Sequence, residues 1–366
     1  MRQELALDIL AKIMQWSIER AREEFSWLSL MSRLKYDRYR DFVAGMRFIE
    51  NLIDWLQQFD QADREAAYRF VRNELVFICS SEMRHLVEQF YFETVCWRIL
   101  TAISSVLRIP RWQIYTNPEA MAKFKELLQK TLFLGLSDGA QIDTFRRANV
   151  GTIGNEQVVA AYQIDDDKWQ SLLKDLRKNT GNTSAKFAFV FLIDDFAGSG
   201  FTLLRKENEK WKGKMVRFWN NVKNNVDDFF TEDWILCVHH YLGTHTARSD
   251  IQKRNDDVKQ EKKNNWFREV KFSFGMTSPQ NFPFDKQKSN AFNDIVQKYY
   301  DSTIQNEHTE IGGSGDMRYG FHGCALPLVL EHNTPNNSIA LIWAESEGVG
   351  ENHAMRPLFR RRQRHI

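Results

Sequence analysis

Apolar positions in the first hundred-odd residues recur at spacings of three and four, a pattern that lines one face of a helix. The clearest run is Phe42, Met46, Ile49, Ile53 and Leu56. Long stretches here contain neither glycine nor proline, and they predict further helices over 3–30, 62–79 and 82–105. Pro110 and Pro118 interrupt the pattern, and a short helix is expected at about 119–130. We therefore predict an all-helical N-terminal region over residues 1–120.

Beyond residue 130, short apolar runs alternate with amphipathic or charged stretches. The runs lie at 131–136, 187–193, 234–240, 270–274, 325–330 and 338–343. The stretches long enough for helices lie at 141–149, 166–178, 202–229 and 288–301. Strands that alternate with helices predict an α/β domain with a doubly wound, mostly parallel sheet. We assign this domain to residues 121–366, with the boundary near 110–130.

Composition excludes some classes of protein and leaves the predicted fold unchanged. A length of 366 residues predicts about two domains. The net charge of +2 does not give the strong overall field expected of a nucleic-acid-binding protein. The chain has no run of about 18 apolar residues and no apolar signal core at its N-terminus. Its four cysteines are widely spaced, which favours reduced thiols. We expect a cytoplasmic protein without a membrane span.

The most informative segment is KFAFVFLIDDFAGSGFTLL, residues 186–204. An apolar strand ends in the two carboxylates Asp194 and Asp195, and the small-residue turn Gly198-Ser199-Gly200 follows. We predict that a helix opens at Phe201 and Thr202. In open α/β sheets, ligands bind beyond the carboxyl ends of the strands.

A turn of small residues that leads into a helix offers backbone N–H groups to a phosphate. Two adjacent carboxylates are natural partners of vicinal ribose hydroxyls or of Mg²⁺ with its waters. The segment therefore predicts a ribose-5-phosphate site. The alternative is a buried strand with an aspartate helix cap and a glycine turn, which accounts for one aspartate but not for two. The loop lacks the lysine of an ordinary P-loop.

This segment resembles the phosphoribosyl-diphosphate (PRPP) signature of type I phosphoribosyltransferases, in which two acids follow an apolar strand and precede a small Ser/Thr-Gly-x-Thr loop. The resemblance implies that Asp194 and Asp195 bind the ribose hydroxyls, with Mg²⁺ as cofactor and the same two carboxylates as its ligands. It also implies a loop that holds the 5-phosphate, formed by Ala197, Gly198, Ser199, Gly200 and Thr202. Phe196 and Gly198 depart from the usual pattern, which has a smaller aliphatic residue and a Thr, Ser or Ala at these positions.

A wider resemblance covers nearly the whole chain. It rests on GMRFIENLIDWLQQF (45–59), REAAYRFVRNELVFICSSEMRHLV (64–87), LSDGAQIDTFRRAN (136–149), NEQ (155–157), EHNTPNN with IW (331–343) and RPLFRR (356–361). These segments are similar to the phosphoribosyltransferase-like family of bacterial conflict systems, often called PRTase-CE. The resemblance implies a role as an effector in an antiphage defence locus, including retron loci, with partners such as a reverse transcriptase.

Two further groups of residues follow predicted strands and are expected at the same edge of the sheet. The turn Ser137-Asp138-Gly139-Ala140 follows the first strand, and Asp138 and Gly139 are candidates to meet a pyrophosphate, with Arg146 or Arg147 as the cation. A tight turn with an aspartate cap is the alternative. His239 and His240 end the strand 234–240 and are candidates for proton transfer, or else structural histidines.

Two polar stretches complete the chain. Residues 245–266 are mixed in charge and predict a solvated helix or a loop. The C-terminal segment carries five arginines, Arg356, Arg360, Arg361, Arg362 and Arg364, which suit contact with nucleic acid or an acidic partner, or else form a solvated tail.

Three functions stay open at this stage. The first is an enzyme that acts at the anomeric carbon of a ribose-5-phosphate, and the second is a non-catalytic nucleotide sensor. The third is a nucleic-acid-binding or protein-binding subunit of a defence complex.

Overall fold

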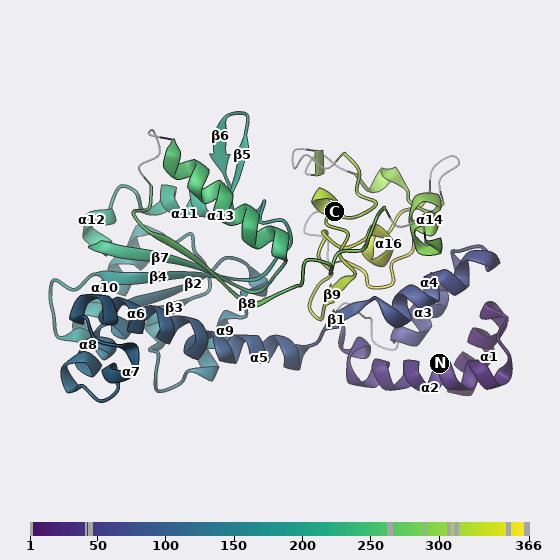
Figure 1. Cartoon of the computed structure of the whole chain (residues 1–366), viewed down its shortest axis with the longest axis horizontal. Coiled ribbons are helices and arrows are strands. Elements are labelled where there is room, and N and C mark those ends of the chain that lie inside the picture. The colour runs from purple at the N-terminus through teal and green to yellow at the C-terminus, as the bar shows by residue number, and fades with distance from the viewer. Residues whose placement is uncertain are drawn as a thin grey trace. The chain divides into compact units, whose positions relative to one another are not determined.

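The computed structural model describes residues 3–40, 42, 47–261, 266–287, 290–305, 309–310, 315–348 and 353–361. The chain divides into two compact units (Figure 1). Unit 1 comprises Met1–Glu82 and Pro279–Ile366, and unit 2 comprises Met83–Ser278. These units do not coincide with the predicted domains 1–120 and 121–366. Both ends of the chain contribute to unit 1, whereas the helices that follow Glu82 pack on the sheet of unit 2.

Unit 2 contains a five-stranded parallel sheet with the spatial order β3-β2-β4-β7-β8. Its strands are β2 (Thr131–Gly135), β3 (Val158–Val159), β4 (Phe187–Ala197), β7 (Phe230–Gly243) and β8 (Val270–Thr277). Counted in chain order, this arrangement is 2-1-3-4-5, a doubly wound order. The predicted α/β fold with a mostly parallel sheet is thereby confirmed. Sequence reasoning missed β3, because two residues are too short to produce a pattern.

Helices cover both faces of this sheet (Figure 1). On one face, leucine and valine side chains of β2, β4 and β7 pack against α10 (Asp166–Thr180), α11 (Lys214–Val222) and α13 (His245–Gln260). On the other face, Phe133 and Phe191 pack with Phe90 of α5 (Ser80–Phe90) and Phe145 of α9 (Ile142–Ala148). The remaining helices of unit 2 are α6 (Trp97–Leu107), α7 (Arg111–Ile114), α8 (Pro118–Gln129) and α12 (Val226–Phe229).

The single helical stretch predicted over 202–229 is wrong in its first part. An antiparallel hairpin of β5 (Arg205–Glu207) and β6 (Lys210–Lys212) precedes α11. Asn208 and Glu209 adopt φ values of 48° and 60° between the two strands. A two-residue turn with both central residues at positive φ fits the natural twist of a hairpin. Gly213, at φ 122°, then starts the helix.

Unit 1 combines N-terminal helices with segments from the C-terminal part of the chain. Its main helices are α1 (Gln3–Met14), α2 (Ile18–Leu34), α3 (Phe48–Gln57), α4 (Gln61–Asn73), α14 (Ala291–Lys298) and α16 (Ala340–Trp343). The run predicted at 325–330 does form a strand, β9 (Leu328–Leu330), but it pairs with β1 (Val76–Ile78) in a separate two-stranded sheet. The run at 338–343 is the short helix α16 rather than a strand, since periodicity does not separate short buried helices from strands.

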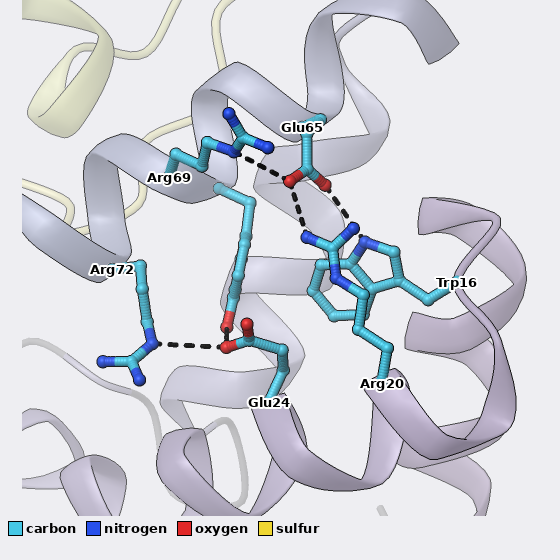
Figure 2. Close-up of polar contacts among 7 residues, drawn as sticks. Trp16, Arg20, Glu24, Glu65, Arg69 and Arg72 are labelled. Carbon is cyan, nitrogen blue, oxygen red and sulfur yellow. Dashed lines mark hydrogen bonds and ion pairs between the residues drawn. The ribbon is translucent and has the colours of Figure 1, made fainter.

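Figure 2 shows a polar network in unit 1 that joins α2 to α4. The Glu65 carboxylate accepts hydrogen bonds from Trp16 Nε1 at 3.0 Å, from Arg20 at 2.6 Å and from Arg69 at 2.9 Å. Partial burial alone would raise the pKa of Glu65, but the hydrogen bonds from Arg20, Trp16 and Arg69 outweigh it and lower this pKa. The network therefore stabilises the pairing of the two helices at neutral pH and weakens when Glu65 is protonated in acid.

The C-terminal segment is built into the core of unit 1. Leu358 and Phe359 are fully buried, and the Phe359 ring contacts Tyr36, Phe48 and Phe77. Beside it, the backbone carbonyl of Arg360 accepts a hydrogen bond from the Tyr39 hydroxyl at 2.6 Å. The arginine side chain forms an ion pair with Glu345. This part of the predicted basic tail is therefore a packed segment, and residues 362–366, with Arg362 and Arg364, lie outside the described residues.

One helical stretch of the described residues, Ser80–Leu107, is long and apolar enough to cross a membrane by length and composition. It consists of α5, a π-helical segment (Tyr91–Cys96) and α6. The Phe90 ring in this stretch stacks on His239 of β7, with 4.1 Å between the ring centroids. Within the most apolar part of this stretch, 39% of the residues are buried.

Candidate functional site

The strand order puts a topological switch point at the carboxyl ends of β2 and β4. These strands are neighbours, and the chain leaves β2 toward β3 on one side and β4 toward β7 on the other. The connections that follow β2 and β4 therefore diverge, and ligands of doubly wound sheets bind at such a switch point. Both the turn 137–140 and the segment 194–202 start here. The topology thus selects the same edge of the sheet as the sequence motif.

The structure brings the turn after β2 into contact with the acid pair. The Ser137 hydroxyl donates a hydrogen bond to Asp194 Oδ1, and the Leu136 N–H donates to the Ile193 carbonyl at 2.7 Å. Asp138 is exposed and Gly139 is half-buried in a 3₁₀ turn (Asp138–Ala140). Ser137 was not among the candidate residues. Its role arises from the pairing of β2 with β4, which no local pattern encodes.

Asp194 is buried and paired with a lysine that sequence reasoning missed. Its side chain is 7% exposed, and its Oδ2 lies 2.5 Å from the Nζ of Lys214, which is 13% exposed. Burial raises the pKa of the Asp194 carboxyl, and the Lys214 ammonium counteracts part of that rise. Lys214 is the first residue of α11, where the helix dipole disfavours a cation. Because a helix was predicted over 202–229, Lys214 fell in its interior, and no sequence signal marked it as a site residue.

Asp195 points away from Asp194, because successive side chains leave a strand on opposite faces. Asp194 pairs with Lys214 of α11. Burial raises the pKa of Tyr241 on the aromatic face, and the charges of Asp195 and Asp194 add to that rise. Asp195 also accepts a hydrogen bond from the backbone N–H of Phe196 at 2.8 Å. The two carboxylates therefore leave β4 on opposite faces, and their joint role as Mg²⁺ ligands stays a prediction. Within the described ranges, no cluster of three or more His, Cys, Asp or Glu side chains is placed to hold a metal.

The loop after β4 is fixed through its carbonyl groups. Thr244 Oγ1 donates to the Gly198 carbonyl at 2.6 Å, and Arg254 donates to the Ser199 carbonyl at 3.0 Å. The Ala197 carbonyl accepts from the Thr244 N–H at 3.0 Å. Across a trans peptide bond, the N–H points opposite to the preceding carbonyl. The N–H groups of Ser199 and Gly200 therefore point away from Thr244 and Arg254, an arrangement suited to an anion.

The predicted helix at Phe201 and Thr202 is absent from the structure, yet a helix N-terminus does reach the loop. Residues 201–204 form turns, and the β5–β6 hairpin brings the chain back so that α11 begins beside them. The Lys214 N–H donates to the Thr202 carbonyl at 3.1 Å, and the Met215 N–H donates to the Leu203 carbonyl at 3.2 Å. The hairpin insertion therefore preserves the contact between loop and helix that the sequence motif implied.

Gly200 provides a test of the loop, since its backbone is left-handed and closely packed. It has φ +67°, and a Cβ atom there would lie 2.3 Å from Ile251 of α13. Gly181 has a similar φ of +64° with nothing within 4 Å. We expect Gly181→Ala to lower the unfolding free energy by about 1 kcal/mol, the usual penalty for a non-glycine residue with a left-handed backbone. Gly200→Ala should cost about 1–3 kcal/mol more, because the added methyl overpacks the loop.

Urea unfolding of both variants measures this difference in unfolding free energy. Equal losses for Gly200→Ala and Gly181→Ala would show that α13 does not confine the loop.

The two arginines predicted to bind the anion lie elsewhere. Arg146 and Arg147 are exposed in the last turn of α9, and both pair with Asp143 of the same helix, at 2.5 Å and 2.7 Å. The cation that the structure places beside Asp194 is Lys214. A role for Arg146 and Arg147 in ligand binding stays a prediction.

His239 and His240 are buried side chains of β7. The His239 Nδ1 lies 2.9 Å from the Ser273 hydroxyl, and the His240 ring stacks on Phe274. Burial lowers the pKa of His239 well below its usual value. Burial, aided by the Lys214 charge, lowers the pKa of His240 to about 3. Both rings are therefore neutral near pH 7, which favours the structural interpretation over proton transfer.

A hollow of about 520 Å³ adjoins the loop on the side of α13 and the hairpin. Charged, polar and aromatic side chains line it: Phe201, Arg205, Lys206, Trp211, Arg254, Asp257, Gln260 and Glu261. None of these residues belonged to the predicted site. Arg254 joins this hollow to the loop through its hydrogen bond to the Ser199 carbonyl.

Comparison with known proteins points to a family. The family model PRTase-CE matches residues 52–361, which is most of the chain. No curated protein and no solved structure matches the chain. The matched range includes the sheet, the acid pair, the loop and the C-terminal segment that packs in unit 1. The chain is therefore a phosphoribosyltransferase-like protein that belongs to the PRTase-CE family.

Proposed function

We propose that this protein binds PRPP or a nucleotide at the carboxyl ends of β2 and β4 and acts at the anomeric carbon of the ribose. One observation carries the proposal. The buried Asp194 carboxylate lies at the switch point of the sheet and accepts hydrogen bonds from Ser137 and Lys214. The loop beside it is held through its carbonyl groups, so its N–H groups point away from the residues that hold it. This combination supplies acceptors for ribose hydroxyls next to donors for a phosphate.

In this proposal each element of the site has one task. The carboxylates of Asp194 and Asp195 accept hydrogen bonds from ribose hydroxyls, and the N–H groups of Ser199 and Gly200 donate to the 5-phosphate. The turn with Asp138 and Gly139 meets the leaving group. Catalysis then depends on positioning and electrostatic stabilisation of an oxocarbenium-like state, which requires no side-chain nucleophile.

Mg²⁺ enters this proposal together with the ligand. Pyrophosphate oxygens are ligands that Mg²⁺ prefers, and substrate phosphates often complete its coordination. Asp194 and Asp195 leave β4 on opposite faces, so the chain offers an ion at most one of these carboxylates at a time. When bound, the ion would neutralise charge on the leaving group.

The biological role follows from the family resemblance. We propose that the protein is an effector of a bacterial antiphage defence system, associated with a retron and its reverse transcriptase.

A non-catalytic nucleotide sensor is the second candidate. The Lys214–Asp194 ion pair favours it, because an acid already neutralised by a lysine suits binding without turnover. The arginines of the C-terminal segment suit a nucleic-acid contact within such a defence complex.

Calorimetric titration with PRPP and Mg²⁺ tests the site. Losing a charge-assisted hydrogen bond costs about 1.5–3 kcal/mol, so we expect Asp194→Asn and Asp195→Asn each to weaken binding by about tenfold to a hundredfold. Asp228→Asn, at an exposed position of the short helix α12 that precedes β7, is the control and should bind as the wild type does. Unchanged affinity in both site variants would contradict the ribose assignment.

The fate of the ligand separates the two candidates. After the titration, analysis of the bound PRPP shows whether it has been consumed. Consumption, lost in Asp194→Asn, would identify an enzyme and exclude the sensor. Intact ligand in the presence of nucleobases and of a partner protein would identify the sensor.

A further inference from the structure

Lys214 links the two halves of the candidate site. Its backbone N–H donates to the Thr202 carbonyl of the loop, and its side-chain Nζ lies 2.5 Å from Asp194 Oδ2. Gly213 precedes it at φ +122°, and a Cβ at Gly213 would lie 2.4 Å from the Leu203 carbonyl oxygen. The turn into α11 therefore admits only glycine, and it fixes where the lysine side chain begins.

The position of Lys214 opposes the preference of a helix. Cations are disfavoured at a helix N-terminus, where the dipole is positive. The lysine ammonium is also largely withdrawn from water, which is costly unless it has a partner. Asp194 is that partner, and both of its oxygens are engaged, one by Ser137 and one by Lys214. A metal ion on Asp194 would have to displace the ammonium, and Asp195 on the opposite face does not help to hold it.

We propose that the Lys214 ammonium is the resident cation of this site and occupies the place at Asp194 that a protein-bound divalent ion would otherwise take. The sugar-phosphate part of the ligand then binds without a metal ion on the protein's carboxylates. This inference rests on the proposed function for the identity of the ligand, but its central claim concerns the chain's own charge pair. The three hydrogens of the ammonium allow it to bond Asp194 and still donate to a ligand oxygen.

The first test needs no sugar ligand. Mn²⁺ binding to the ligand-free protein is measured by electron paramagnetic resonance. We expect no Mn²⁺ site at Asp194 in the wild type, and one new site in Lys214→Met that disappears in Lys214→Met/Asp194→Asn. Lys223→Met removes one exposed lysine from the other end of α11 and is the matched control. A Mn²⁺ site in the wild type that Asp194→Asn removes would overturn the proposal.

The second test uses ribose 5-phosphate, which lacks the pyrophosphate and chelates metals weakly. We expect the wild type to bind it with the same affinity, within about threefold, in EDTA and in saturating Mg²⁺. Lys214→Met should bind about tenfold to a hundredfold more weakly in EDTA, the loss expected for one charge-assisted hydrogen bond, and should recover in Mg²⁺. Lys214→Arg retains the charge and should stay independent of metal.

The outcomes of the two tests are distinguishable. Wild-type affinity that collapses in EDTA and returns with Mg²⁺ would overturn the proposal. Absence of ribose 5-phosphate binding under every condition would contradict the proposed function, and the Mn²⁺ result would then decide on Lys214 alone. Circular dichroism of Lys214→Met and Lys214→Arg confirms that each variant is folded before either test is interpreted.

Discussion

Replacing Phe359 with alanine is expected to lower the unfolding free energy of unit 1 by about 3–5 kcal/mol, the range for large-to-small changes at buried aromatic positions. The Phe359 ring is 0% exposed and lies between helix α3 and strand β1, in contact with Phe48 and Phe77. Removing the ring leaves a cavity that several side chains from different segments line. Such a site collapses poorly, so the loss should lie toward the upper end of the range.

Urea unfolding, combined with hydrogen exchange of peptides from unit 1, measures this loss. Phe92→Ala is the matched control, because the Phe92 side chain is 71% exposed in unit 2. Its effect should stay within about 0.5 kcal/mol. If Phe359→Ala and Phe92→Ala lose similar stability, the C-terminal segment does not belong to the core of unit 1.

Acidification is expected to destabilise unit 2, because His239 and His240 are buried and neutral. Their folded pKa values are lowered, that of His240 to about 3, whereas an unfolded histidine titrates near 6.5. The unfolded state therefore binds more protons below pH 6.5, and stability falls as the pH falls toward the folded pKa. Lowering the pH from 8 to 5 is therefore expected to reduce the unfolding free energy by about 2 kcal/mol per histidine, because each pH unit below 6.5 contributes about 1.36 kcal/mol.

Unfolding free energies measured at several pH values between 8 and 5 test this expectation. His239→Asn and His240→Asn remove the titrating groups, so each should flatten the pH dependence by about one histidine's share. His245→Asn, at the exposed start of α13, should leave the slope unchanged. A slope that persists in the double variant His239→Asn/His240→Asn would mean that other groups cause the loss.

The acid response of unit 1 has a different origin. The pKa of Glu65 is lowered, so the contribution of its carboxylate is present above the unfolded pKa near 4.5 and is lost as the pH falls through the folded value. The histidine effect in unit 2 begins about two pH units higher. Hydrogen exchange that resolves the two units can therefore separate the two transitions.

Local pattern was sufficient to predict most of the parallel sheet and the acid pair. A buried central strand must be a continuous apolar run, and 187–193 is one, so the strand and the carboxylates at its end were readable from the sequence. The small-residue turn at 198–200 could also be predicted, because few residues tolerate the left-handed backbone of Gly200. The wider family resemblance rested on other local segments, among them 45–59 and 331–343, and the match over residues 52–361 confirms it.

Contacts between distant segments were decided by the tertiary structure. Lys214 reaches Asp194 across twenty positions only because the β5–β6 hairpin turns the chain back toward the loop. Ser137 meets Asp194 only because β2 pairs with β4 in register. The arginine-rich segment looks solvated as a sequence, yet Phe359 within it completes an aromatic core formed by residues some three hundred positions earlier.

The physical reason is the range of the forces that each feature reflects. Strand and turn preferences arise from neighbouring residues and the side-chain period, so they are written locally in the sequence. Ion pairs, the burial of a carboxylate and the partner of a hydrophobic segment depend on which elements pack together. Local pattern therefore located the expected phosphate and ribose site, whereas the packing of distant elements brought Lys214 to Asp194.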